Sequence, residues 1–237
     1  MSIAASLAII ILAALIHSSF QLSLSVLTIL SGHTIGSKNT QKKLFSLTTN
    51  FLFGAGIITL LLMSVIVLIL INLFGSNSPQ VIWAGGCGLL FGVAISVWLF
   101  YYRRQKGTAL WIPRGVAKYL MVRTKATKMK SEAFGLGMMS VMGEILFIIA
   151  PLFVGSLAIT QLPAPWQILG IIVYAEISLS SLSIIWFLIG RGKSLSKIQR
   201  WRENNKYFLQ FVAGAGLIVL SLFVYVYEIL GTTVGGL

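Results

Sequence analysis

The sequence contains no aspartate, and its acidic residues are five glutamates among 237 residues. Cysteine occurs once, which excludes an intramolecular disulfide and a paired zinc or redox motif. A dedicated divalent-metal site usually needs several carboxylates or imidazoles close together. The two histidines, His17 and His33, would lie about 24 Å apart along one helix and could not share a haem. We therefore predict no metal site and no cofactor.

The motifs of common enzyme chemistry are also missing. We find no glycine-rich phosphate loop, no Ser-His-Asp set and no HExxH pair. The sequence therefore predicts a protein that is not an enzyme.

Apolar residues dominate the composition. They make up 57% of the chain, and the mean hydropathy is +0.93. A water-soluble domain of this size keeps a larger polar exterior than this composition provides. Six windows are long and apolar enough to cross the roughly 30 Å hydrocarbon core as helices: residues 3–30, 47–74, 81–102, 133–160, 166–190 and 207–230. We predict an all-α integral membrane protein with six transmembrane helices.

The positive charge is confined to three segments between these windows. All 18 Lys and Arg residues fall within 31–46, 103–132 and 191–206. A nucleic-acid-binding protein would instead carry its basic residues on a docking face, so the net charge of +13 does not indicate a nucleic-acid partner. Because Lys and Arg collect in cytoplasmic loops, these three segments are predicted to be cytoplasmic. Both termini then face outward (N-out/C-out), and the membrane is predicted to be the plasma (inner) membrane.

The middle basic segment, residues 103–132, is long enough to hold structure of its own. Apolar and aromatic residues alternate with basic ones there at near-helical spacing: Trp111, Ile112, Val116, Tyr119, Leu120 and Val122. A basic amphipathic helix lying on anionic lipid is the interpretation we favour. A docking site for a protein partner is the alternative.

Two pairs of segments suggest an internal duplication. Residues 19–32 align with 142–155, so that Gln21 corresponds to Glu144 and Gly32 to Gly155. Residues 86–89 in the third window resemble 214–217 in the sixth. With three spans in each half, a repeat must be inverted, as in many transporters. We therefore predict a first three-helix repeat at 1–102, the basic loop at 103–132 and a second repeat at 133–237. Homodimerisation is left open.

Ionisable groups inside hydrocarbon cost several kcal/mol each and are functional candidates by default. Windows one, four and five each carry one polar stripe with such a group, namely His17, Glu144 and Glu176. Stripes of this kind are expected to face one another, although Ser, Thr and Gly stripes also serve ordinary helix packing. The predicted solute- or ion-binding residues are His17, Gln21, Ser25, Thr28, Ser140, Glu144, Pro151, Glu176 and Ser180.

Two of these residues have specific expected roles. Glu144 is the predicted proton-coupling or cation-contacting group. Pro151 lacks an amide donor and could break the fourth helix at mid-membrane. Transporters often hold a solute at such a broken helix.

The chain resembles the lysine exporter (LysE) superfamily in its layout. The resemblance includes six spans, the long basic loop before span four, the segment Phe134-Gly135-Leu136-Gly137, and the stretch from Gln199-Arg200-Trp201 to Gly214-Ala215-Gly216-Leu217-Ile218. It implies two inverted three-helix repeats. The Pro-Gly-Pro-type motif of the amino-acid exporters, the paired cysteines of the thiol carriers and the Asp-rich motifs of the metal exporters are absent, so no substrate carries over.

The resulting hypothesis is a small secondary transporter that moves a small solute outward by alternating access. In this hypothesis His17, Gln21 and Ser25 face Ser140, Glu144 and Pro151, with Glu176 alongside. The rival hypothesis is a membrane scaffold, assembly factor or partner subunit whose polar stripes only pack helices. A redox relay is disfavoured by the single cysteine.

Overall fold

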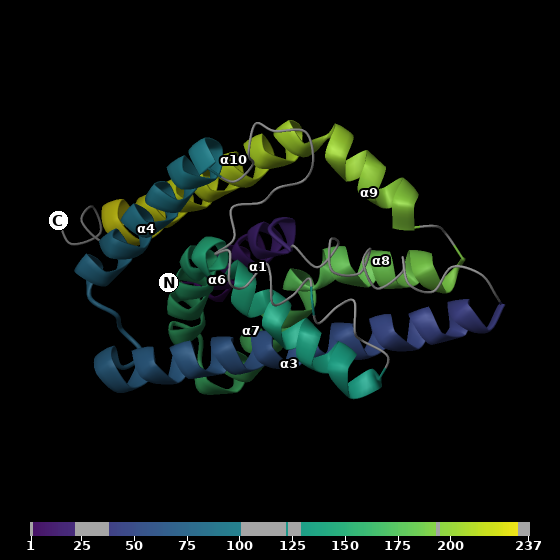
Figure 1. Ribbon diagram of the computed structural model, residues 1–237. Helices are drawn as coiled ribbons and strands as arrows, with labels where there is room; N and C mark the ends of the chain where they lie inside the picture. Colours follow the sequence, from purple (N-terminus) through teal and green to yellow (C-terminus); the bar gives the residue numbers. More distant parts are fainter. Residues whose placement is uncertain (1, 22–37, 101–121, 123–128, 193–194, 232–237) are drawn as a thin grey trace.

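The computed structural model describes residues 2–21, 38–100, 122, 129–192 and 195–231, and all regular structure in these ranges is helical (Figure 1). The elements are α1 (Ile3–Ser19), α3 (Lys38–Phe74), α4 (Gln80–Phe100), α6 (Lys130–Thr160), α7 (Ala164–Ser178), α8 (Ser180–Gly190), α9 (Leu195–Asn204), α10 (Lys206–Val224) and the π-helical turn η1 (Tyr225–Leu230). The predicted all-α class is confirmed for the described residues.

Several helices are long and apolar enough to cross a membrane. Four qualify alone, within α3, α4, α6 and the continuous α10–η1 segment, and α7 with α8 makes a fifth as a bent pair. Large apolar side chains such as Phe53, Leu73 and Ile168 are more than 60% exposed, an arrangement suited to lipid and not to water. The chain is therefore a membrane-embedded helical protein.

The helix bounds follow the predicted windows closely at four places. The window at 47–74 differs, because α3 begins at Lys38, inside the first basic segment. The first window differs as well. α1 has 17 residues and is about 25 Å long, and most of the remainder of the predicted span, 22–30, lies outside the described residues.

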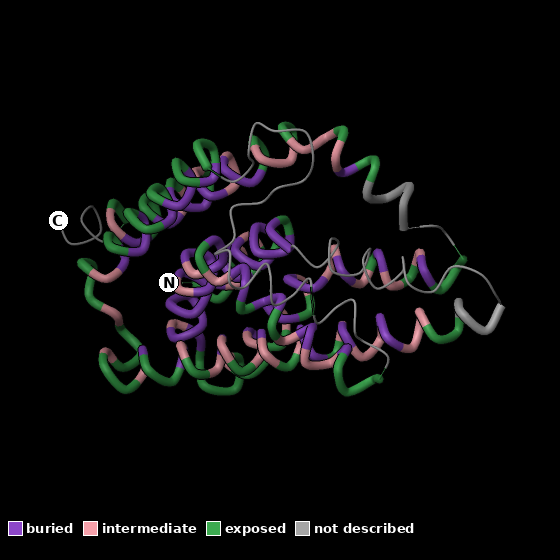
Figure 2. Tube along the Cα trace, viewed as in Figure 1, coloured by how far each residue is buried: buried purple, intermediate pink, exposed green. Residues whose placement is uncertain are grey.

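α1 and α6 occupy the centre of the bundle (Figure 2). α4 and α10 lie side by side along one edge, and α3 lies on the opposite side of that centre (Figure 1). The central core includes Ile9 and Ala13 of α1 with Ile148 and Leu152 of α6, all fully buried. A helix that is apolar on every face is expected to be buried, and α1 and α6 fit this expectation.

Close approach of α3 and α6 depends on two glycines. A Cβ atom at Gly54 would collide with the backbone carbonyl of Phe134, and one at Gly137 would collide with the carbonyl of Phe51. Small residues let transmembrane backbones approach in this way. Farther along, the Ser156 hydroxyl contacts Met63 Sδ at 3.2 Å. The contacts advance in the same direction on both helices, so α3 and α6 are parallel.

The other helix pairs have equally clear directions. Ile10 lies near Gly170 and His17 bonds Tyr174, so α1 and α7 are parallel. α4 and α10 are antiparallel, since Cys87 pairs with Ser221 and Trp98 with Phe211.

α3 and α8 are antiparallel as well. Phe45 packs on Gly190, and the indole N–H of Trp186 donates to Thr49 Oγ1 at 2.8 Å. The α8 part of the fifth predicted window is thus antiparallel to the second window.

Candidate functional site

The fifth predicted span is broken in its middle. α7 ends at Ser178 and α8 begins at Ser180, and the two helices meet at an angle of 52°. Such a break leaves backbone carbonyls of the first segment and amides of the second without helical partners. In hydrocarbon each of these groups must find another partner within the protein.

Side chains from the end of α1 supply those partners. Gln21 Nε2 donates to the carbonyl oxygen of Ser178 at 2.7 Å. The Ser181 backbone N–H donates to Ser18 Oγ at 3.1 Å, so Ser18 caps the start of α8 from another helix. The Ser181 hydroxyl donates to the Ser18 carbonyl at 3.0 Å. We call Ser18, Gln21, Ser178 and Ser181 the α1–α8 clamp.

Ser180 and His17 extend this polar contact in both directions. Ser18 Oγ lies 2.9 Å from Ser180 Oγ. At the preceding residue of α1, His17 Nδ1 lies 3.1 Å from the Tyr174 hydroxyl of α7. His17 and Tyr174 are fully buried, and His17 Nε2 has no hydrogen-bond partner among the described residues. The contact between spans one and five is thus polar over more than a helical turn.

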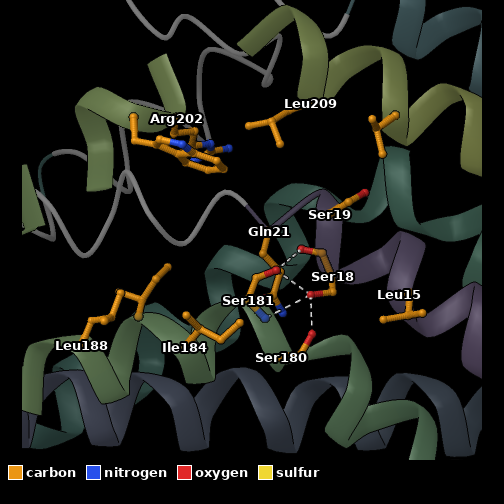
Figure 3. Close-up of a pocket in the computed structure, with 13 residues that line it drawn as sticks. Leu15, Ser18, Ser19, Gln21, Ser180, Ser181, Ile184, Leu188, Arg202 and Leu209 are labelled. Carbon is orange, nitrogen blue, oxygen red and sulfur yellow. Dashed lines mark hydrogen bonds between the residues drawn. The ribbon is translucent and has the colours of Figure 1, made fainter. Parts of the chain in front are cut away.

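A cavity of about 480 Å³ adjoins the clamp, and we call it the α8 cavity (Figure 3). Its polar lining includes Gln21, Ser180 and Arg202, and its apolar walls come from α1, α8 and α10. A second, mostly apolar cavity of about 380 Å³ lies between α1 and α10 and shares Leu15, Ser19 and Val212 with the first. We call this one the α10 cavity. The volume of the α8 cavity falls in the range typical of small-molecule sites, roughly 300–1,000 Å³.

The predicted site residues are only partly brought together. His17 and Gln21 bond residues of span five, not the expected Ser140, Glu144 and Pro151 of span four. Spans one and four nevertheless touch, because the Phe20 and Phe147 rings stack with their centroids 6.0 Å apart. Ser25 and Thr28 lie outside the described residues.

Within α6 the predicted residues are buried, but each differs from expectation. Ser140 donates to the Gly137 carbonyl of its own helix at 2.9 Å. The expected break at Pro151 is wrong, because α6 continues through this residue to Thr160. Glu144 is 1% exposed and lines neither of the two cavities.

Glu176 does not face inward as predicted. Its side chain is exposed on α7, while Ser180 lines the α8 cavity. In a continuous helix, 100° per residue would place Glu176 and Ser180 on one face, but the helix bends by 52° between α7 and α8. The prediction therefore fails at the bend itself.

The predicted site residues did not include Tyr174, three of the four clamp residues (Ser18, Ser178 and Ser181) or Arg202 of the cavity. For Arg202 the sequence does carry a signal, which is an amphipathic pattern of apolar and basic residues within the basic segment 191–206. In the structure this pattern forms α9. The interfacial helix predicted within 103–132 lies almost wholly outside the described residues. Of the described residues, no group of three or more His, Cys, Asp or Glu is arranged to hold a metal ion.

Comparison of the chain with protein-family models, with curated proteins and with solved structures finds no match. The fold and the site therefore define the class of this protein: it is a membrane-embedded helical protein with a broken helix beside a cavity.

Proposed function

We propose that this protein is a small secondary transporter that exports a small solute by alternating access. The observation that carries the proposal is the broken span five, whose freed backbone groups are held by the end of α1 beside a cavity of about 480 Å³. Broken helices next to a cavity are a recurrent way for transporters to hold a solute. A scaffold that only packs helices has no need of such a break.

Six spans with alternating direction form part of this proposal, and the helix directions support it. In a six-span chain, spans one and five run the same way, as do spans two and four, whereas spans three and six run oppositely. The parallel pairs α1/α7 and α3/α6 and the antiparallel pair α4/α10 agree with this scheme. We assign the three basic segments, 31–46, 103–132 and 191–206, to the cytoplasmic side, and the membrane to the plasma (inner) membrane.

The same contacts support two inverted three-helix repeats. Exchanging the triplets converts the α1–α7 pair into the α6–α3 pair, and both pairs are parallel. It also converts the α1–α10 contact into the α6–α4 contact, and each of these contains a glycine of the matched motifs, at the second glycine in one motif and at the first in the other. Gly216 lies against Ile16, and Gly86 lies against Val154. This arrangement is also the one implied by the proposed likeness to the lysine exporter superfamily.

The two cavities provide a path for the solute. The residues lining the α8 cavity run along α8 from the break, at Ser180, to Leu188, and continue to Arg202 of α9 and the start of α10. The end of α8, α9 and the start of α10 belong to or adjoin the proposed cytoplasmic segment 191–206. The α10 cavity continues from Ser19 back along α1 to Leu12. Rocking of one triplet against the other would open this path from one side at a time. Glu144, buried in the helix that packs on α1, is the proposed proton-coupling group.

A solute-flux screen with the purified protein in proteoliposomes tests the function. The panel contains small organic anions, organic cations and neutral solutes, and empty liposomes set the background. Gln21→Leu removes a clamp residue. Gln167→Leu is the matched control, because Gln167, in the first turn of α7, also donates to a backbone carbonyl, that of Leu162, but lies away from the clamp. We expect flux of at least one class with the parent and Gln167→Leu, and its loss with Gln21→Leu. Equal flux in all three proteins would contradict a role for the clamp in transport.

A further inference from the structure

The α8 cavity contains a buried positive charge. Arg202 of α9 is only 8% exposed and lines the cavity. Figure 3 shows Arg202 and Leu209 on one side of the cavity, with Ser18, Ser180 and Ser181 on the other. Among the described residues, the structure records no ion pair and no hydrogen bond for the Arg202 side chain.

No side chain of the protein neutralises this guanidinium within the cavity. All five carboxylate side chains of the sequence belong to glutamates in the described ranges, and none of them lines the α8 cavity. A desolvated charge without a counter-charge carries a large free-energy penalty. A bound anion would remove this penalty, and a planar guanidinium binds a carboxylate or phosphate through paired hydrogen bonds.

A second polar group in the cavity lacks a described partner. Gln21 is 7% exposed and lines the cavity, and its Oε1 atom is buried with no hydrogen-bond partner among the described residues. Its Nε2 atom is already used in the bond to Ser178. A ligand or a ligand-bound water with a donor at this end would satisfy Oε1.

The remaining walls are apolar. Leu15 of α1, Ile184 and Leu188 of α8, and Leu209 and Val212 of α10 surround the space between Arg202 and the clamp. A strongly hydrated inorganic anion would gain little from these walls, whereas a hydrocarbon chain would be removed from water. Charge and lining together therefore define one ligand chemistry.

We propose that the α8 cavity binds an amphipathic organic anion, with its carboxylate or phosphate at Arg202 and its hydrocarbon part against α1, α8 and α10. This inference rests on the proposed transport function, because it identifies the anion as the class of solute that the same site would transport. The binding itself can be measured without transport. The anion has two possible sources: a water-soluble molecule or the headgroup of a membrane lipid.

The test measures binding of radiolabelled octanoate to the full-length protein in nanodiscs of neutral phosphatidylcholine. Arg202→Gln removes the charge in the cavity. Arg200→Gln removes a charge from the same helix at an exposed position and is the matched control. We expect Arg202→Gln to weaken octanoate binding about tenfold or more, as expected for loss of one charge-assisted contact, and Arg200→Gln to leave it unchanged. Octanol and octylammonium are expected not to compete.

Two further arms identify the source of the anion and control for misfolding. Weaker octanoate binding to the parent in nanodiscs containing phosphatidylglycerol than in neutral nanodiscs would identify a lipid headgroup as a competing occupant. Lack of competition would identify a water-soluble anion. Arg202→Lys keeps the charge and should retain part of the binding, which separates loss of charge from loss of fold.

Equal octanoate binding by the parent and Arg202→Gln would overturn the inference, as would competition by octanol or octylammonium. Absence of binding to the parent in neutral and anionic nanodiscs alike would also overturn it. Arg202-dependent binding without flux of any solute would instead contradict the proposed transport function while leaving the anion site in place.

Discussion

Gln21, two residues beyond the end of α1, donates a 2.7 Å hydrogen bond to the carbonyl oxygen of Ser178, the last residue of α7 before the break. This bond joins the ends of two helices that run in the same direction and are separated by more than 150 residues in the sequence. It couples the position of α1 to the geometry of the break. Any movement of the end of α1 relative to α7 must keep this bond or exchange it for another.

Ser18→Ala should destabilise the protein measurably. The substitution removes the acceptor of the Ser181 N–H at the start of α8. We expect a loss of about 1 kcal/mol in the free energy of unfolding, a typical value for a lost helix cap that lies within the range of interhelical bonds in membranes. Unfolding by a denaturing detergent in mixed micelles measures it. Ser96→Ala is the control, because Ser96 is exposed and bonds only Gly92 of its own helix. Equal stability of the two variants would argue against the clamp.

Gly137→Ala should be far more damaging than Gly135→Ala on the same helix. A methyl group at position 137 collides with the backbone of α3 at Phe51 and Ala55, which cannot move without separating the helices. At position 135 nothing lies within 4 Å of the added atom. We expect a loss of about 2 kcal/mol or more for Gly137→Ala, within the range known for overpacking, and slight stabilisation or no change for Gly135→Ala. Thermal unfolding in detergent compares them, and similar values would contradict the close α3–α6 contact.

Glu144→Gln and Glu176→Gln should differ in their effect on transport. Glu144 is buried in α6, whereas Glu176 is exposed on α7. If Glu144 couples a proton, its neutral amide cannot exchange one, and proton-driven flux should fall at least tenfold while the protein still folds. Glu176→Gln should retain most of the flux. Flux into proteoliposomes with an imposed pH gradient provides the measurement, with size-exclusion profiles as the folding control. Full flux in a folded Glu144→Gln protein would remove Glu144 from the coupling mechanism.

The positions of the long helices were predictable because hydropathy over about 20 residues reports directly on burial in hydrocarbon. The break in span five was not. Residues 178–180 read Ser-Leu-Ser, with no proline or glycine to signal it. The break depends instead on Ser18 and Gln21, which reach it through the tertiary structure. Pro151 carries the local signal for a break, yet α6 passes through it, because neighbouring helices in a membrane can support a proline.

The site was predictable only where local geometry stayed regular. His17 lies within α1 and makes an inward contact, as the helical spacing suggests. Gln21 also contacts the fifth predicted span, although it lies two residues beyond the end of α1. The same spacing would put Glu176 and Ser180 on one face of a continuous helix, but the 52° bend between α7 and α8 separates them. Arg202 reaches the α8 cavity from the segment after span five, so span-by-span reasoning could not find it.

The most direct test of alternating access is the reactivity of a cysteine at position 19. Ser19 lines both cavities, and Cys87→Ser removes the only native thiol. A membrane-impermeant maleimide is applied from each side in oriented vesicles, and Ser156→Cys, at a fully buried position, is the unreactive control. Because labelling is irreversible, it accumulates even from a minor conformation. Alternating access predicts labelling of Ser19→Cys from both sides, with octanoate shifting the ratio of the two rates. Labelling from one side only, at a rate that octanoate leaves unchanged, would contradict transport and favour a static membrane module.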